Sequence, residues 1–390
     1  MRFRGGGRGS RRGFLRSGSA AALLAGAVPG RTVWPNARIK VGVIGCGSVS
    51  RRYLPHLKAC GAVELVSVCD KRPERARAAA EKFGVPHHYP HVDDFLGGAA
   101  FDLMVNLTDM QEHGRLNRFG LEAGRHVWSE KPLANTVDDG RGLLELARAR
   151  GLGIWAAPVV VLSPQFRFMR EQVRSGRLGR VAAAHAAYGH LGPDWSAFFY
   201  EEGGGSLPDL GVYNLTTLTA LLGPARAVTA MTSIVTPRRV VEDKGSIAVE
   251  AEDNAMVLID HGGGTLSHVQ CGFNYFDPGG HDGAGRELPT IAVTGTKGTM
   301  HLVGYDWAPK GVDLATADHP SLVRHATDTQ GYVWEMGASH VAECLAAGTE
   351  PGVSAEQALH VLEIIVAARE AQRTGQRQEL ATSFPWPVAG

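Results

Sequence analysis

The chain has 390 residues, enough to bury a large core and to form two domains more readily than one. Hydrophobic residues make up 44% and charged residues 20%, which is ordinary for a soluble globular protein. The formal net charge of +1 hides an asymmetry, because residues 1–31 hold seven arginines and no acid. The rest of the chain is mildly acidic and has no basic stripe, which argues against nucleic acid as a partner.

The N-terminus reads as an export signal. Twin arginines in "SRRGFLR" (10–16) precede a weakly apolar run and an Ala-x-Ala cleavage site at 25–27. We predict a twin-arginine-type signal peptide and linker over residues 1–36, use of the twin-arginine export machinery and an extracytoplasmic location. The apolar run is about half the ~20 residues that span a bilayer, so no permanent membrane span is expected. A disordered basic tail is the alternative.

Residues 37–157 follow the pattern of a dinucleotide-binding domain. A Val- and Ile-rich run, "IKVGVIG" (39–45), leads into a glycine turn and then a helix, and this order places a pyrophosphate at the helix N-terminus. A second apolar run ends at Asp70, where an acid can accept the ribose hydroxyls of NAD. Lys71 and Arg72 follow directly, so NADP is not excluded. A solvated acid that merely ends a strand is the other interpretation of Asp70.

With "LEAGRHVWSEKPLA" (121–134) the chain resembles the Gfo/Idh/MocA superfamily of oxidoreductases, in its glucose–fructose oxidoreductase-like branch. The resemblance extends from about residue 39 to 380. Further matching segments are "LTDMQEH" (107–113), "SGRLGRV" (175–181), "GGGSLPDLGVY" (203–213) and "IAVTGTKGTMHL" (291–302). The family usually has Pro-Asn where this chain has Asp109-Met110, and "APVVVLSPQFRFM" (157–169) lacks an arginine that usually precedes Ser-Pro.

The resemblance implies an α/β protein with a Rossmann domain over 37–157 and, over 158–381, an α/β domain with a large, mostly antiparallel open sheet. β-rich runs with glycine turns in the second half support this independently. The helix at 354–371 is expected to pack back towards the Rossmann domain, and a homo-oligomer (dimer or tetramer) is expected. The cofactor expected is NAD, held tightly, with NADP not excluded, and the cofactor-binding residues expected are Gly45, Gly47, Ser48, Val49, Asp70, Thr108, His113, Glu130 and Lys131.

Oxidation of an alcohol carbon requires loss of a hydride to the nicotinamide and of a proton from the hydroxyl. Lys131 is the first catalytic candidate, because it stands at a strand's carboxyl end and an ammonium stabilises a developing alkoxide. Tyr213 is the second, provided that Lys131 lowers the pKa of its phenol. Asp209 shares a helix face with Tyr213. The alternatives are core packing for Tyr213 and, for Asp209, a capping box with Ser206.

The substrate contacts expected lie in an aromatic loop at 188–205. Its residues Tyr188, His190 and Trp195 can stack on and hydrogen-bond a sugar, although ordinary loop packing explains them equally well. We predict no metal site: the histidines of "PHHYPH" (86–91) lack helical spacing and carboxylate partners, and the five cysteines contain no CxxC pair.

The function expected is an exported NAD(P)-dependent oxidoreductase acting on a hydroxyl carbon of a sugar, polyol or glycoside. Because no free nicotinamide pool is expected outside the cytoplasm, the cofactor would stay bound and be reset by a second substrate. Two alternatives belong to other classes: a glycosidase or epimerase that oxidises its substrate transiently, and a non-catalytic binding protein on the same fold.

Overall fold

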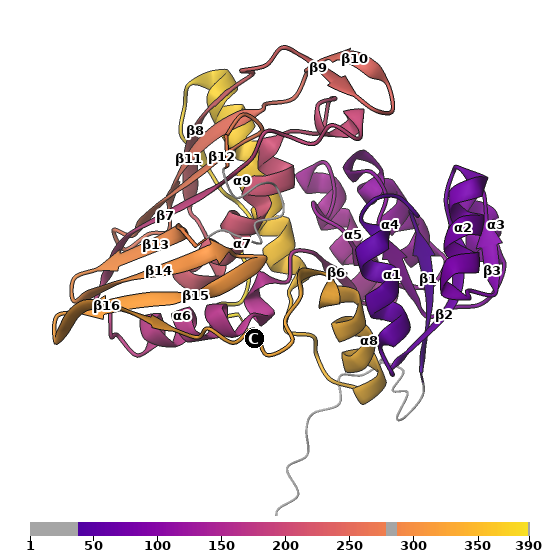
Figure 1. The fold of residues 1–390 in the computed structure, drawn as a ribbon, viewed down its shortest axis with the longest axis horizontal. Coiled ribbons are helices and arrows are strands. Elements are labelled where there is room, and N and C mark those ends of the chain that lie inside the picture. Colours follow the sequence, from indigo (N-terminus) through magenta and orange to yellow (C-terminus); the bar gives the residue numbers. More distant parts are fainter. Residues whose placement is uncertain (1–37, 278–286, 389–390) are drawn as a thin grey trace, which may run out of the picture. The chain divides into compact units, whose positions relative to one another are not determined.

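The computed structural model describes residues 38–277 and 287–388 (Figure 1). The predicted signal peptide lies outside these residues. The first part of the described chain alternates strands and helices, and the second part is rich in antiparallel strands.

The first sheet has six strands in the order β3-β2-β1-β4-β5-β6, and every neighbouring pair is parallel. Its central strand β1 is buried at five of six positions, as expected for a Val- and Ile-rich strand covered on both faces. This strand order is that of a Rossmann domain. The strands are β1 (Ile39–Ile44), β2 (Val63–Cys69), β3 (His87–Tyr89), β4 (Leu103–Asn106), β5 (His126–Ser129) and β6 (Ile154–Ala156).

The helices of this domain begin and end where the sequence provides caps. Helix α4 stops at Gly124, which has a φ of 76° that favours glycine. The side chain of Thr136 caps α5 by accepting from the N–H of Asp139. The helices are α1 (Ser50–Ala59), α2 (Pro73–Phe83), α3 (Val92–Gly97), the short η1 (Met110–Glu112), α4 (His113–Glu122) and α5 (Val137–Ala149).

The second domain contains a nine-stranded sheet in the order β16-β15-β14-β13-β7-β12-β11-β8-β17. Only β7 and β12 pair in parallel among its described strands, so the sheet is mixed and mostly antiparallel. Together with the Rossmann domain it confirms the predicted fold class. The strands are β7 (Val181–Gly189), β8 (Ala227–Ser233), β11 (Asn254–Asp260), β12 (Leu266–Gly272), β13 (Pro289–Gly295), β14 (Gly298–Tyr305), β15 (Ala308–Thr316), β16 (His319–His325) and β17 (Gln378–Glu379).

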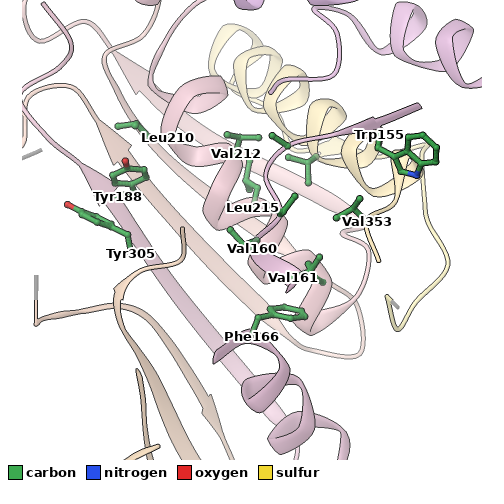
Figure 2. Close-up of a cluster of buried hydrophobic side chains, with 14 of the residues drawn as sticks. Trp155, Val160, Val161, Phe166, Tyr188, Leu210, Val212, Leu215, Tyr305 and Val353 are labelled. Carbon is green, nitrogen blue, oxygen red and sulfur yellow. The ribbon is translucent and has the colours of Figure 1, made fainter. Parts of the chain in front are cut away.

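One face of this sheet is covered by helices, and the core lies between them. Figure 2 shows Leu210, Val212 and Leu215 of one helical segment together with Tyr188 and Tyr305 from the strands. The remaining elements are η2 (Val160–Leu162), α6 (Pro164–Arg174), η3 (Ala197–Phe199), η4 (Leu207–Gly211), α7 (Val212–Leu222), η5 (Trp334–Met336), α8 (Gly337–Ala347), α9 (Ala355–Thr374) and a separate hairpin of β9 (Arg238–Val241) and β10 (Gly245–Ala248).

The last two helices connect the two sheets. Helix α9, yellow in Figure 1, contacts β8 and α7 and also α5 and β6 of the first domain. Helix α8 contacts α1 and strands β1, β2 and β5. A segment from late in the chain therefore completes the packing around the Rossmann sheet.

Candidate active site

The glycine turn after β1 ends in a row of backbone N–H groups without protein partners. Gly45 has a φ of 94°, and a Cβ there would lie 2.6 Å from a backbone carbonyl of the loop after β4, so only glycine fits. Ser50 closes the turn by donating its hydroxyl to the carbonyl of Gly47 at 2.7 Å. Within the described part of the chain, the N–H groups of Gly47, Ser48 and Val49 donate to no protein acceptor. They are available to bind an anion such as a pyrophosphate.

Asp70 lies beside this turn and is held by the main chain. Its Oδ2 accepts from the N–H of Cys46 and its Oδ1 from the N–H of Arg72, each at 2.8 Å. The residue is buried, so the interpretation as a solvated acid is wrong. Each carboxylate oxygen keeps a second lone pair, which ribose hydroxyls can use. Lys71 turns away to pair with Asp109 at 3.1 Å.

Thr108 and His113 fix the backbone after β4. Thr108 donates its hydroxyl to the side-chain oxygen of Asn106 at 2.7 Å. His113 is 1% exposed, and its ring nitrogens lie 2.8 Å from the carbonyl of Pro132 and 3.0 Å from that of Thr108. Burial lowers the pKa of His113. The prediction that its side chain contacts the cofactor is corrected: because the main chain engages both nitrogens, His113 is a positioning residue.

Glu130 is a buried carboxylate at the end of β5. Its Oε1 accepts from the hydroxyl of Tyr53 at 2.6 Å, and its Oε2 accepts from the N–H of Lys131 at 3.2 Å. Burial, reinforced by the charge of Glu130, raises the pKa of Tyr53 well above its ordinary value, so Tyr53 remains a hydrogen-bond donor. Tyr53 has no sequence signal, since a single tyrosine within a helix carries no motif.

Lys131 joins the two domains through Asp209. Its Nζ donates to Oδ1 of Asp209 at 2.5 Å and to the Asp209 carbonyl at 2.8 Å. The two side chains are only 11% and 12% exposed, so solvent screens the ion pair little. The ammonium also lies 5.2 Å from the centre of the Tyr213 ring. The peptide between Lys131 and Pro132 is cis. The structure thus brings the three predicted catalytic residues together.

The expected electrostatic effect on Tyr213 is corrected. Burial, followed by the charge of Glu130 and the neighbourhood of Tyr188 and Asp209, raises the pKa of Tyr213 well above 10. Lys131 lies over the ring face rather than beside the oxygen, and burial outweighs it. In the described chain the Tyr213 hydroxyl has no hydrogen-bond partner, and it is not among the fully buried polar atoms. It is therefore a neutral phenol with its proton available for donation.

Asp209 does not form the alternative capping box. Ser206 makes no side-chain capping bond to the helix, and the Asp209 carboxylate is engaged by Lys131. The turn that carries Asp209, η4, is π-helical, a feature often found at functional sites. Glu252 holds its start by accepting from the N–H of Leu207 at 3.1 Å, and Arg369 of α9 pairs with Glu252 at 3.1 Å. Neither Glu252 nor Arg369 had a sequence signal.

The predicted substrate residues take different positions. The ring of Tyr188 lies 6.0 Å from that of Tyr213, in an edge-on arrangement, and 6.1 Å from His190. Trp195 instead packs against Phe198 and Phe199 of its own loop, and its ring centre lies 4.7 Å from that of Phe199. Among the described residues it makes no ring contact with Tyr188 or His190.

Two further rings extend the group around Tyr188. Tyr305 lies 4.5 Å and Trp307 6.3 Å from Tyr188, and these two rings stack on each other at 5.5 Å. Neither Tyr305 nor Trp307 has a sequence signal, because the turn between β14 and β15 is distant in the chain from the motifs.

Comparison with protein families decides the relationship. A model described as "Oxidoreductase family, NAD-binding Rossmann fold" matches residues 39–157, and the "GFO/IDH/MocA C-terminal domain" matches residues 166–301. The chain belongs to the GFO/IDH/MocA oxidoreductase family. Its first domain is accordingly an NAD-binding Rossmann domain, and the free N–H groups of the glycine turn and the fixed Asp70 carboxylate fit that cofactor.

Two proteins named for their activities and one solved structure resemble the chain over most of its length. A D-apiose dehydrogenase from Paraburkholderia graminis is 27% identical, over 88% of this chain and 90% of its own. A 1,5-anhydro-D-fructose reductase from Ensifer adhaerens is also 27% identical, over 88% and 99%. The crystal structure of GenD2, from gentamicin A biosynthesis, in complex with NAD is 25% identical, with a TM-score of 0.71 over 92% and 100%.

Asp306 is a buried carboxyl behind α7 of this GFO/IDH/MocA protein. Its Oδ2 accepts from Asn214 at 3.0 Å and from the Thr217 hydroxyl at 2.9 Å, while its Oδ1 has no partner among the residues described. Burial raises the pKa of Asp306 from 3.8 to about 6, because the charged form loses its hydration.

This raised pKa predicts pH-dependent stability. The folded state binds the proton more tightly than the unfolded state, so the free energy of unfolding falls as pH rises from about 4 to about 6 and stays lower above that. The D306N variant should lack this component, which amounts to roughly 3 kcal/mol. Urea unfolding at pH 4 and pH 7 measures it. Identical pH dependence in both proteins would show that Asp306 does not titrate there.

Residues 38–277 and 287–388 contain no group of three or more His, Cys, Asp or Glu side chains arranged to hold a metal ion. They also contain no helix of sufficient length and apolar character to cross a membrane.

Proposed function

We propose that this protein is an exported oxidoreductase that transfers hydride between a tightly bound nicotinamide cofactor and a hydroxyl carbon of a sugar, polyol or glycoside. One observation carries the chemistry: Lys131 Nζ lies 2.5 Å from the Asp209 carboxylate and 5.2 Å from the centre of the Tyr213 ring. A fixed cation and an unengaged phenol thus stand next to each other at the carboxyl end of β5, where ligands of open α/β sheets bind.

Bound NAD supplies the hydride acceptor, and the chain's own residues handle the oxygen. The Tyr213 hydroxyl donates a hydrogen bond to the substrate oxygen, since its pKa keeps it protonated. In the oxidation direction the hydroxyl proton passes to the Asp209 carboxylate, which lies on the Lys131 ammonium, and this ammonium stabilises the alkoxide so formed until hydride leaves for the cofactor. Asp209 fixes the position of the ammonium by accepting hydrogen bonds at both its carboxylate and its main-chain carbonyl.

The substrate class is supported by the relatives and by the aromatic group. Both curated relatives named above act, by their names, on sugars or sugar derivatives. Tyr188, which lies edge-on to Tyr213, and Tyr305 are buried, whereas Trp307, stacked on Tyr305, is partly exposed and can present a face to the C–H side of a sugar ring.

The proposals of export and a retained cofactor rest on the sequence. The twin arginines Arg11 and Arg12, the apolar run and the Ala-x-Ala site have the order of an export signal. The twin-arginine route carries folded proteins, so a cofactor can travel inside the fold. Fractionation of cells expressing the full chain or R11K/R12K tests this. Equal amounts outside the cytoplasm for both would contradict it.

Association into a homo-oligomer is also proposed. Four large apolar side chains on β8, β11 and β12 are exposed on the face opposite the helices: Met231, Met256, Leu258 and Leu266. Burial of this surface between two copies would remove it from water. Light scattering of the purified protein measures the mass, and a monomer at micromolar concentration would contradict the proposal.

The central experiment uses the mature protein as purified. Absorbance and fluorescence report bound NAD(H), and a panel of sugars, polyols and glycosides is then added. Reduction of bound cofactor that persists until a carbonyl acceptor is supplied supports the proposal. Cleavage or epimerisation of a sugar without net reduction would instead indicate transient oxidation, and the absence of both cofactor and response would indicate a binding protein.

A further inference from the structure

Asp306 ties the turn between β14 and β15 to helix α7. The residue is 2% exposed, and its Oδ2 accepts from the side-chain amide of Asn214 at 3.0 Å and from the hydroxyl of Thr217 at 2.9 Å. Asn214 directly follows Tyr213, and Thr217 lies one turn later on the same face of the helix as Tyr213. Both donors therefore belong to the part of α7 that carries the phenol.

This tie lies close to an irregular start of the helix. Helix α7 continues directly from the π-helical turn η4, whose i→i+5 hydrogen bonds change the direction in which the following side chains point. Gln357 of α9 holds α7 further along, by donating to the carbonyl of Thr216 at 3.0 Å. Because Asp306 accepts from two positions three residues apart, it fixes the rotation of the segment next to Tyr213.

The same turn places two aromatic rings near Tyr213. Tyr305 precedes Asp306 and Trp307 follows it, and the two rings stack with an interplanar angle of 7°. The ring centre of Tyr305 lies 4.5 Å from that of Tyr188, which is itself edge-on to Tyr213 at 6.0 Å. Trp307 is partly exposed. Asp306 thus connects the helix of the phenol to the turn of a ring that can contact the C–H face of a sugar.

The Asp306 carboxyl is a costly way to hold this turn on α7. Its Oδ1 and the Oδ1 of Asn214 are buried and have no hydrogen-bond partner among the residues described. Buried polar atoms without partners destabilise a fold, so apolar contacts between the turn and the helix would be at least as stable. A group of this kind is expected where the position of the bonded elements serves function.

We propose that Asp306 is a positioning residue that keeps the Tyr213 phenol in register with the Trp307 ring and so determines which hydroxyl of the substrate is oxidised. The substrate class that requires this is a sugar ring with several free secondary hydroxyls, because these have similar reactivity and alignment alone distinguishes them. A sugar held against Trp307 presents one of its carbons to the phenol. The inference rests on the proposed sugar oxidation and adds a residue that sets its position on the ring.

The test compares D306A and D306N with the wild type, using the mature protein and a sugar that reduces the bound cofactor. We expect D306A to lower kcat about 10- to 100-fold, since a misplacement of about 1 Å can cost that much, and to oxidise more than one position of the sugar. NMR of the products identifies the positions. D306N should keep kcat within about threefold and give the wild-type product, because its amide oxygen can accept from the same two donors.

A second pair of variants removes one of the two hydrogen bonds without touching Asp306. T217V should lower kcat about fivefold and broaden the product distribution. T219V is the matched control, because Thr219 is a buried threonine of the same helix whose hydroxyl donates to the carbonyl of Leu215. Crystal structures of the wild type, D306A and T217V give the position of the Tyr213 ring relative to Trp307 without any need for turnover.

Wild-type kcat with a single product in D306A overturns the proposal, as does an equal loss in T217V and T219V. A loss in D306N as large as that in D306A also overturns it, since the charge of Asp306 would then act rather than its position. If D306A does not fold, the comparison of T217V with T219V decides. A wild type that oxidises no sugar would refute the proposed function, and the crystal structures would still decide whether Asp306 positions Tyr213: an unmoved ring overturns this inference and a displaced ring supports it.

Discussion

Turnover should fall about 10³-fold when Lys131 is replaced by methionine, while dinucleotide binding persists. Methionine keeps much of the length of the side chain but removes the charge that would stabilise the substrate oxygen. Lys131 was also expected to bind the cofactor, but its Nζ is engaged by Asp209, and the N–H groups that can hold a pyrophosphate belong to the separate glycine turn. The loss should therefore appear in kcat, measured as sugar-dependent reduction of bound cofactor, with the dissociation constant of NAD within about twofold of the wild type.

K131M should also lower the folding stability, and this effect must be distinguished from the loss of turnover. Removal of Lys131 leaves the Asp209 carboxylate without its cation at a mostly buried position, and such a loss typically costs about 3–5 kcal/mol. The double variant K131M/D209N removes both charges and should recover much of that stability. It should remain inactive. K244M, which breaks the surface pair of Lys244 with Glu201, is the control for loss of a lysine.

The outcome that contradicts this assignment is specific. If K131M/D209N folds with near wild-type stability and still reduces bound cofactor at more than about a tenth of the normal rate, the ammonium does not stabilise the reacting oxygen. K131R gives a finer comparison. It keeps the charge but spreads it over a plane, so it should retain the pair with Asp209 and restore part of the rate.

The first domain could be predicted closely because its local signals agree with one another. The strand at 39–44, the glycine turn and the acid at Asp70 belong to one βαβ unit, where backbone geometry determines residue type. Gly45 shows this directly, since its φ and its approach to a carbonyl exclude any side chain. The motif at Glu130–Lys131 could likewise be placed at the end of a strand.

The surroundings of the site could not be predicted from sequence, because tertiary contacts create them. Tyr53 meets Glu130 across 77 positions, and Glu252 meets Leu207 across 45. The sequence around Tyr53 or Glu252 contains no pattern that distinguishes either residue from one on the protein surface. The two predictions that the structure corrects, on the His113 side chain and on the pKa of Tyr213, also failed because tertiary contacts decide them. His113 turns inward to backbone carbonyls, and burial around Tyr213 outweighs the nearby cation.

The second large effect is expected for Tyr213. Replacement by phenylalanine should lower kcat about 10²-fold and leave dinucleotide affinity and folding stability nearly unchanged. The hydroxyl has no hydrogen-bond partner in the described chain, so its removal leaves no protein group unsatisfied there. The ring, which packs edge-on to Tyr188, remains. Y89F is the matched control, since the Tyr89 hydroxyl accepts only from the N–H of Ala99.

The pH dependence of wild type and Y213F shows whether Tyr213 acts as the neutral phenol or as the phenolate. Burial raises its pKa well above 10, so the wild type should show no ionisation of this group between about pH 6 and pH 9.5. Profiles of kcat/KM for wild type and Y213F should then be parallel over that range and differ by a constant factor. An alkaline ionisation near pH 8 that is present in the wild type and absent from Y213F would mean that the phenolate acts instead. In that case a cation, the bound nicotinamide or Lys131, would have to overcome burial, and the proton would leave the substrate through Tyr213 itself.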